Sequence, residues 1–268
     1  MSMEQDYRSL TDEQLELLEK QTLRLAVQAV QQYSAEAKAL FETTPATAES
    51  EVIVLAEDLV QYALEVAECY PINARFAGFI DYKRVRWMPT PFGLIPQAFL
   101  VDAKASTENF RETLQQSQLP MDAEFESKGQ VVTLAAGVPP HMNVVLPSGN
   151  ALPAVTTSLF VHFHYTSNTA GPPYRTLHAI YVMALPHQRL KSRYNPDPQT
   201  TFFGQGKHSP KRNEDQRIRV YFARLREMAP WRLQELRYSN QSPYTEPVWR
   251  DVDGQGREVE NRFEFIGR

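Results

Sequence analysis

Two runs of sequence decide the fold: RFAGFIDYKRVRW at residues 75–87 and QAFLVDA at residues 97–103, which continues into KAS at residues 104–106. Both are rich in the β-branched and aromatic side chains that favour extended strands. The connection between them, MPTPFGLIP at residues 88–96, holds three prolines and a glycine, which is typical of a rigid turn. The pattern therefore predicts two neighbouring strands.

The flanking sequence predicts helices before these strands and a mixed set of elements after them. Thr11 followed by Gln14 is a capping-box pattern, and it opens a predicted helix over residues 11–41. A second helix is expected over residues 51–69. Downstream we expect a helix that starts at Ser106 or Thr107 and ends near Pro120, followed by further strands at residues 131–134, 155–165, 177–185 and 217–222. The chain is thus predicted to form one α/β domain over residues 1–268, with a mixed sheet and an N-terminal helical pair.

Composition excludes several classes of protein. The 42% hydrophobic and 22% charged residues are ordinary for a globular protein in water. No apolar run approaches the ~18 residues that a membrane-spanning helix needs, so no membrane partner is expected. The N-terminal MSMEQDYRSL lacks the apolar core of a secretory signal, and one cysteine, Cys69, makes neither an internal disulfide nor a cysteine-based zinc site. We therefore expect a cytoplasmic protein.

Charge is distributed unevenly along the chain, whose net charge is −4. Residues 1–70 hold 4 basic and 14 acidic side chains, and form the predicted acidic helical part. Residues 71–186 are nearly balanced, whereas residues 187–268 hold 16 basic and 11 acidic side chains. Such a concentrated basic part either faces a polyanion or is simply a solvated surface.

The spacing of three charged residues suggests phosphodiester chemistry. Asp81 lies in the first run, and Asp102 and Lys104 lie two residues apart in the second, so that the latter two share one face of a strand. Phosphodiester hydrolysis needs divalent cations, which bind carboxylate oxygens, and a cation beside the reacting phosphate. An acid-x-Lys pattern alone is weak, because it also occurs elsewhere in this chain. The alternative is a structural salt bridge between Lys104 and Asp81 or Asp102.

At these residues the chain resembles the PD-(D/E)xK nuclease superfamily and, within it, the SfiI-like type II restriction endonucleases. The resemblance is carried by several phrases that span about residues 51–236: EVIVLAEDLVQYALEVAE, YPINARFAGFIDYKRVRW, LVDAKAS, SQLPMDAEF, LPAVTTSLFVHF, RYNPDP, FFGQGKHSP and PWRLQEL. The opening helix, with EKQTLR, QQYS and EAK, also matches. One departure is Ile80, which stands where the general motif has proline.

The resemblance implies a function and a set of site residues. It implies a restriction-endonuclease core, with residues 71–186 catalytic and residues 187–268 recognising DNA, in a tetramer that binds two double-stranded sites. The implied reaction is Mg²⁺-dependent cleavage of both strands at an interrupted G·C palindrome, GGCCNNNNNGGCC. The implied site places Mg²⁺ on Asp81, Asp102 and the carbonyl of Ala103, and the catalytic lysine at Lys104. Glu57 is the candidate for an additional acid on an earlier helix, and a solvated helix acid is the alternative for this residue.

The basic part contains the candidates for DNA readout. Arg217 and Arg219 alternate on a predicted strand, so both guanidinium groups face one way and could address guanine edges in the major groove. Lys207, Lys211 and Arg212, in the preceding loop, are candidates for base or phosphate contacts. A solvated arginine-rich strand is the structural alternative.

Other functions have weaker support. His162 and His164 share one strand face, but no third zinc ligand is evident. No Gly-rich phosphate loop of the Walker type is present, so no nucleotide cofactor is expected. Two rivals remain open from sequence: a repair or recombination nuclease with the same core, and a non-catalytic, sequence-specific DNA-binding protein.

Overall fold

The two decisive runs form neighbouring antiparallel strands within a larger sheet in the computed structural model of the chain, which describes residues 7–45, 49–71, 82–90, 93–145, 148–206, 216–246 and 248–263. Strand β2 (Tyr82–Thr90) pairs with β3 (Gly93–Ser106), from Tyr82 opposite Val101 to Thr90 opposite Gly93. The predicted pairing of two neighbouring strands is therefore confirmed over the described residues, and residues 75–81 of the first run lie outside them. The rigid turn predicted over residues 88–96 is wrong, because residues 88–90 and 93–96 continue the two strands. Residues 91 and 92, at the tip of the predicted turn, lie outside the described residues.

The predicted helical pair is present, and the first helix is interrupted. The described helices are α1 (Asp12–Gln32), α2 (Ser34–Thr43), α3 (Glu49–Val66), α4 (Lys191–Tyr194) and α5 (Phe222–Met228). The capping box of α1 is formed, because Thr11 Oγ1 accepts from the Gln14 N–H and Gln14 Oε1 accepts from the Thr11 N–H. Tyr33 leaves the helical conformation, with φ −107° and ψ 17°, and divides α1 from α2. None of the described helices is long and apolar enough to cross a membrane.

The described strands form one large sheet and three small ones. The remaining strands are β1 (Tyr70–Pro71), β4 (Arg111–Gln115), β5 (Ala123–Ser127), β6 (Gln130–Leu134), β7 (His141–Val145), β8 (Ala151–Ser167), β9 (Arg175–Leu185), β10 (Phe203–Gln205), β11 (Arg217–Tyr221), β12 (Leu233–Arg237), β13 (Val248–Val252) and β14 (Glu258–Arg262). The large sheet runs β1-β2-β3-β8-β9-β12, and β7 also pairs with β8. The pairing of β3 with β8 is parallel and all others in this sheet are antiparallel, so the sheet is mixed.

The helix predicted between Ser106 and Pro120 is wrong. This segment forms strand β4 and a short 3-10 turn at Gln116–Gln118. In its sequence RETLQ only Leu114 is apolar, and Leu114 is buried while the other four residues are half-buried. Pairing with the distant strand β11 satisfies the backbone of this segment, and a local pattern does not reveal that partner.

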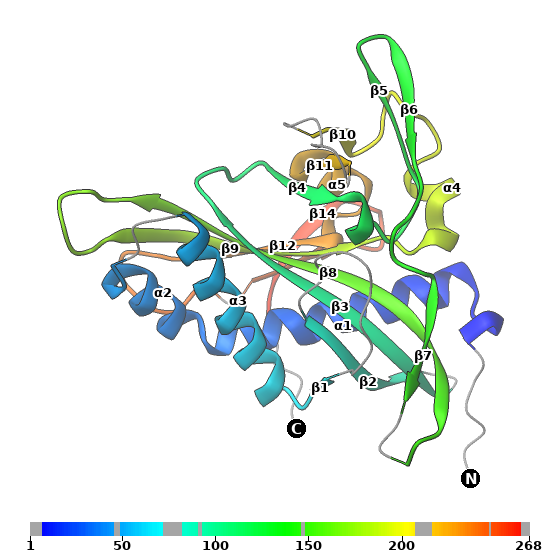
Figure 1. Cartoon of the computed structure of the whole chain (residues 1–268), viewed down its shortest axis with the longest axis horizontal. Helices are drawn as coiled ribbons and strands as arrows, with labels where there is room; N and C mark the ends of the chain where they lie inside the picture. The colour runs from blue at the N-terminus through cyan, green and yellow to red at the C-terminus, as the bar shows by residue number, and fades with distance from the viewer. Residues whose placement is uncertain are drawn as a thin grey trace.

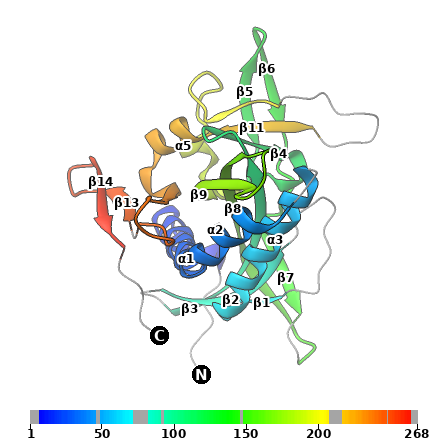
Figure 2. The ribbon, with the colours of Figure 1, turned by 90° about the vertical axis from the view of Figure 1, so that its left-hand side faces the viewer.

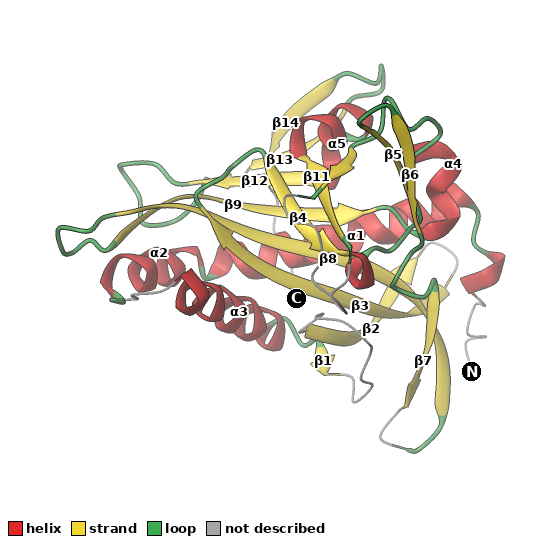
Figure 3. Cartoon of the chain, turned by 45° about the horizontal axis from the view of Figure 1, so that its top comes forward, coloured by secondary structure: helices red, strands yellow, loops and turns green. Residues whose placement is uncertain are grey.

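The large sheet separates two layers (Figures 1 and 3). Helices α1, α2 and α3 lie on one side, and the small β10-β11-β4 sheet lies with α5 on the other. On the helical side, the ring of Phe41 on α2 stacks on Phe163 of β8, with ring centroids 5.5 Å apart. The β5–β6 hairpin projects away from the body of the protein (Figure 2). Its two-residue turn needs left-handed backbone at Lys128 and Gly129, with φ 53° and 75°.

A buried ion pair holds α1 to the sheet. The carboxylate of Glu19 and the guanidinium of Arg232 are both fully buried and lie 2.6 Å apart. The other oxygen of Glu19 accepts from the backbone N–H of His187 at 2.7 Å. Burial raises the pKa of Glu19, and the opposing charge of Arg232 counteracts this rise. The pair joins three distant segments of the chain at one point.

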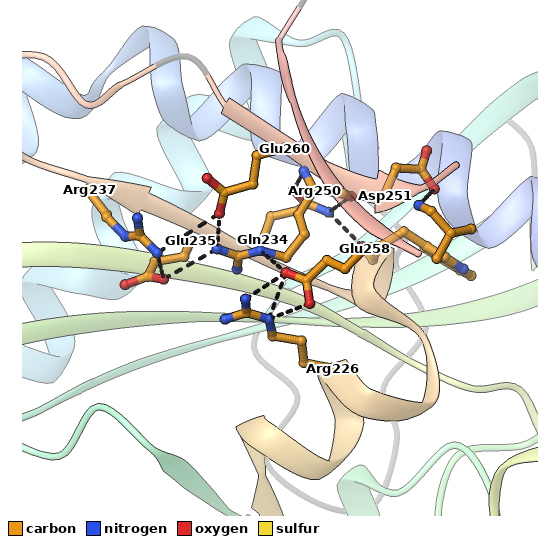
Figure 4. Close-up of polar contacts among 10 residues, drawn as sticks. Arg226, Gln234, Glu235, Arg237, Arg250, Asp251, Glu258 and Glu260 are labelled. Carbon is orange, nitrogen blue, oxygen red and sulfur yellow. Dashed lines mark hydrogen bonds and ion pairs between the residues drawn. The ribbon is translucent and has the colours of Figure 1, made fainter. Parts of the chain in front are cut away.

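The β13–β14 hairpin is attached to β12 and α5 by polar contacts (Figure 4). The side-chain amide of Gln234 donates to the carbonyl of Arg250 and accepts from its N–H, both at 2.8 Å. Arg250 is almost fully buried, and its Nε lies 2.9 Å from Glu258. Arg226 of α5 also bonds to Glu258. These contacts cover the β12 edge of the large sheet, which would otherwise be open to pairing.

Replacing Glu19 by alanine should destabilise the protein by about 3–5 kcal/mol, because the substitution leaves the Arg232 charge buried without its partner. Chemical denaturation of the variant measures this loss. Glu36→Ala, at an exposed position of α2, is the control and should change the free energy of unfolding by less than about 0.5 kcal/mol. A Glu19→Ala protein as stable as the control would show that the pair contributes no net stability.

Candidate functional site

Asp102 and Lys104 lie together on β3, inside the large sheet. Lys104 Nζ is 2.8 Å from Asp102 Oδ2, the Asp102 side chain is 3% exposed and the Lys104 side chain is 25% exposed. In the parallel ladder, Asp102 lies opposite Phe160 and Lys104 opposite His162 of β8. Paired residues of a ladder share one face, so Lys104 and His162 face the same way. The ion pair fits both readings of the sequence, since a structural bridge and an active-site pair need the same contact.

The second predicted acid, Asp81, lies outside the described residues. It directly precedes Tyr82, whose partner across the ladder is Val101, the residue before Asp102. Ala103, whose carbonyl is the remaining candidate ligand, is buried between Asp102 and Lys104. Within the ranges that the structure describes, no group of three or more His, Cys, Asp or Glu side chains gathers into a metal cluster. Asp81, one of the predicted ligands, lies outside those ranges.

Glu57, the predicted additional acid, is half-buried on α3. Helix α3 packs against β3, the strand of Asp102 and Lys104. Its apolar residues Val52, Ala56 and Val60 join the same core as Val101 and Ala103 of β3. The helix is thus anchored beside the acid-x-Lys strand, and the role of Glu57 stays a prediction.

Arg217 and Arg219 lie on β11, the middle strand of the small sheet. The strand alternates, with Ile218 and Val220 buried and both arginines half-buried, so the arginines share the face that points away from the core. The neighbouring strand β4 places Gln115 opposite Arg217 and Thr113 opposite Arg219. We call this outward surface of Arg217, Arg219, Thr113 and Gln115 the arginine face.

Two glycines let β10 approach β11 closely. A Cβ on Gly206 would stand 2.3 Å from the carbonyl oxygen of Arg217, and a Cβ on Gly204 would stand 2.5 Å from the ring of Tyr221. Any side chain at these positions would therefore push β10 away from the strand that carries the arginines. The three loop candidates, Lys207, Lys211 and Arg212, follow Gly206 and lie outside the described residues.

The histidines of β8 and the single cysteine, for which the sequence favoured no catalytic or metal-binding role, lie among other protein groups. His162 is fully buried, with Nε2 2.7 Å from the carbonyl oxygen of Glu108 and Nδ1 bonded to the carboxylate of Glu112. Both ring nitrogens are therefore used within the protein. His164 lies beside His178, with ring centroids 5.2 Å apart, and burial lowers its pKa. Burial raises the pKa of the Cys69 thiol, which disfavours the reactive thiolate.

Sequence reasoning missed the contribution of β4 to this region. Thr113 and Gln115 share the arginine face, and Glu112 points inward to His162, but the segment was expected to be a helix. RETLQ contains a single apolar residue, so the segment has no strand periodicity of its own. The capping pattern at Ser106 and Thr107 therefore favoured a helix.

A mixed sheet with an acid-x-Lys strand in its interior, helices on one face and an arginine-bearing sheet on the other defines the class of the restriction endonucleases. The chain belongs to the SfiI family of type II restriction enzymes, since the family model described as "Type II restriction enzyme SfiI" matches residues 46–236. The type II restriction enzyme SfiI of Streptomyces fimbriatus is 64% identical over 269 residues, which is 99% of this chain and all of that protein.

Solved structures agree with this assignment. The crystal structure of tetrameric SfiI bound to cognate DNA matches with a TM-score of 0.89 and 64% identity, covering 99% of this chain and 100% of that one. The restriction endonuclease BglI, solved with its DNA recognition sequence, matches with a TM-score of 0.66 at 16% identity, covering 83% and 90% of the two chains. At that identity BglI supports the fold alone. The predicted fold and family are confirmed, and the protein is a site-specific nuclease.

Proposed function

We propose that the protein cuts both strands of double-stranded DNA at the interrupted palindrome GGCCNNNNNGGCC, using Mg²⁺ bound at Asp81, Asp102 and the carbonyl of Ala103. The observation that carries the proposal is the buried Asp102–Lys104 pair on a strand whose neighbour, β8, packs beneath the sheet that carries Arg217 and Arg219. The 64% identity to SfiI over the whole chain supports the same specificity.

The residues present suit a hard divalent cation. Carboxylate and carbonyl oxygens are the ligands that Mg²⁺ prefers, and Asp102 brings one such carboxylate into a site largely screened from water. A bound Mg²⁺ supplies Lewis acidity and lowers the pKa of the attacking water. The paired lysine offsets the negative charge of Asp102 at 2.8 Å, which makes a buried carboxylate tolerable before metal binds.

Lys104 has a distinct task in this mechanism. Its side chain is one-quarter exposed, and in this mechanism its ammonium positions the attacking water beside the scissile phosphate. The same charge stabilises the additional negative charge of the transition state. Attack is in line and without a covalent intermediate, so the products carry 5′-phosphate and 3′-hydroxyl ends.

The arginine face supplies the donors that a G·C site requires. Each guanine offers its O6 and N7 to the major groove, and an arginine fork binds both atoms at once. Arg217 and Arg219 stand two residues apart on one strand face, which suits two successive guanines. Lys207, Lys211 and Arg212 are assigned to base or phosphate contacts beside them.

Assembly follows from the symmetry of the site. A two-fold palindrome requires at least a dimer, in which each subunit reads one half-site. We assign this chain the tetrameric, DNA-bound assembly described for SfiI, with two duplexes held at once. We also propose that it acts in the cytoplasm and needs no nucleotide cofactor.

Asp102→Asn should reduce cleavage by several orders of magnitude while leaving sequence-specific binding in Ca²⁺ intact, since it removes a metal ligand and not the readout surface. Lys104→Ala should behave likewise, and Glu57→Ala should show a smaller loss that depends on metal concentration. Single-turnover cleavage of a cognate duplex measures each effect. Asp58→Asn, at an exposed acid of α3, is the control. Near-normal cleavage by the Asp102 or Lys104 variant would refute these assignments.

Arg217→Ala and Arg219→Ala should each remove about 1–3 kcal/mol of discrimination between the cognate duplex and a single-mismatch duplex, because a bidentate contact to guanine is lost. Binding of both duplexes in Ca²⁺ gives this difference. Arg257→Ala, an exposed arginine of the distant β13–β14 hairpin, should leave it unchanged. If the arginine variants keep the wild-type specificity ratio and only reduce the salt dependence, the arginine face contacts phosphates and not bases.

Plasmids with two recognition sites should be cut faster than plasmids with one, because the tetramer acts on two duplexes together. Steady-state cleavage of matched plasmids, with sedimentation of the protein at micromolar concentration, tests this. Equal rates on both plasmids, or a monomer in solution, would contradict the proposed assembly.

A further inference from the structure

A fully buried histidine joins the two halves of the proposed site. His162 of β8 is 0% exposed and packs edge-on against the rings of Tyr181 and Phe222, whose centroids lie 5.9 and 5.6 Å away. Across the parallel ladder its partner is Lys104. A polar ring in this apolar cage is costly unless both of its nitrogens find partners.

Both nitrogens do find partners, and both partners belong to the route from the acid-x-Lys strand to the arginine face. Nε2 lies 2.7 Å from the carbonyl oxygen of Glu108, in the connection between β3 and β4. Nδ1 bonds to the carboxylate of Glu112, on β4 itself. Because a carbonyl oxygen only accepts, Nε2 is the donor in its contact with Glu108, and Nδ1 faces the carboxylate of Glu112.

Glu112 connects the histidine to the arginine face. On β4 it lies opposite Val220 and directly before Thr113, which lies opposite Arg219. The other oxygen of Glu112 accepts from the backbone N–H of Thr113 at 2.7 Å. Phe222, which contacts the histidine ring, begins α5 immediately after β11. The imidazole therefore contacts the connection, the strand and the helix that surround β11.

We propose that His162 and Glu112 are positioning residues that fix the arginine face relative to Lys104, so that correct base contacts align the scissile phosphate with Asp102 and Lys104. Neither residue touches DNA in this scheme. The small sheet keeps its own backbone pairing without them, so it still binds the cognate sequence. The pair instead fixes the position of the arginine face relative to Lys104.

The proposal rests on the proposed function, and predicts a split between binding and cleavage. Glu112→Ala should leave the Kd for cognate DNA in Ca²⁺ within about threefold. It should slow single-turnover cleavage in Mg²⁺ by about 100-fold, the loss expected when a reacting group is misplaced by about 1 Å. His162→Phe keeps an aromatic ring against Tyr181 and Phe222 but cannot bond Glu112, and should show the same split.

A conservative variant of Glu112 distinguishes the loss of its two contacts from a general loss of stability. Glu112→Gln keeps both contacts, because its amide can donate to Nδ1 while its oxygen still accepts from Thr113, so it should cleave within about threefold of the wild type. His178→Ala is the matched histidine control, since His178 is exposed on β9 and bonds to Thr166 instead. Each protein is assayed below its Tm, and active protein is counted by titration with cognate DNA.

Three results would overturn the proposal. In the first, Glu112→Ala cleaves as fast as the wild type. In the second, its Kd weakens by the same factor as its rate, which makes the pair part of binding. In the third, Glu112→Gln is as slow as Glu112→Ala. If His162→Phe does not fold, the two Glu112 variants decide the question. A wild-type protein that fails to cut the cognate duplex would refute the proposed function instead.

Discussion

The parallel pairing of β3 with β8 is the constraint on which the rest of the structure depends. A parallel pair cannot be closed by a tight turn, so the chain between Ser106 and Ala151 must cross over one face of the sheet. The connection contains β4, β5 and β6, and it returns to the large sheet as β7, which pairs with β8. That route brings β4 above the face that carries His162, and β11 then pairs with β4 to complete the arginine face. The surface proposed to read DNA is therefore attached through the connection that follows the acid-x-Lys strand.

Several buried ionisable groups among the described residues lie in pairs. Glu19 is paired with Arg232, Asp102 with Lys104, and His162 with Glu112. The first and third pairs each join segments that are distant in the sequence. Buried pairs of this kind contribute little net stability, but removing one member is costly, and so they restrict the alignment of the elements they connect. In a nuclease that must place a phosphate within a fraction of an ångström, this restriction serves catalysis.

Local sequence patterns predicted many of the helices and strands. The segment that was wrongly predicted to be a helix depends on pairing between strands that are distant in the sequence. The two strand runs at residues 75–87 and 97–103, the capping box at Thr11 and the spacing of Asp102 and Lys104 are all signals within a few residues. The segment at residues 111–115 depends instead on β11, about a hundred residues later, and a local capping pattern led to a wrong helix there. The contact between His162 and Glu112 could not be predicted for the same reason, because it joins β8 to β4, two strands that are about fifty residues apart in the sequence.

Cleavage specificity tests the central claim most directly. A library of random-sequence duplexes is digested with the purified wild-type protein in Mg²⁺, and every new end is sequenced. The account predicts that the ends, which carry 5′-phosphates, fall inside the spacer of GGCCNNNNNGGCC, and that digestion stops when Mg²⁺ is chelated. Ends scattered over unrelated sequences, or a library that stays intact with Mg²⁺ present, would contradict it.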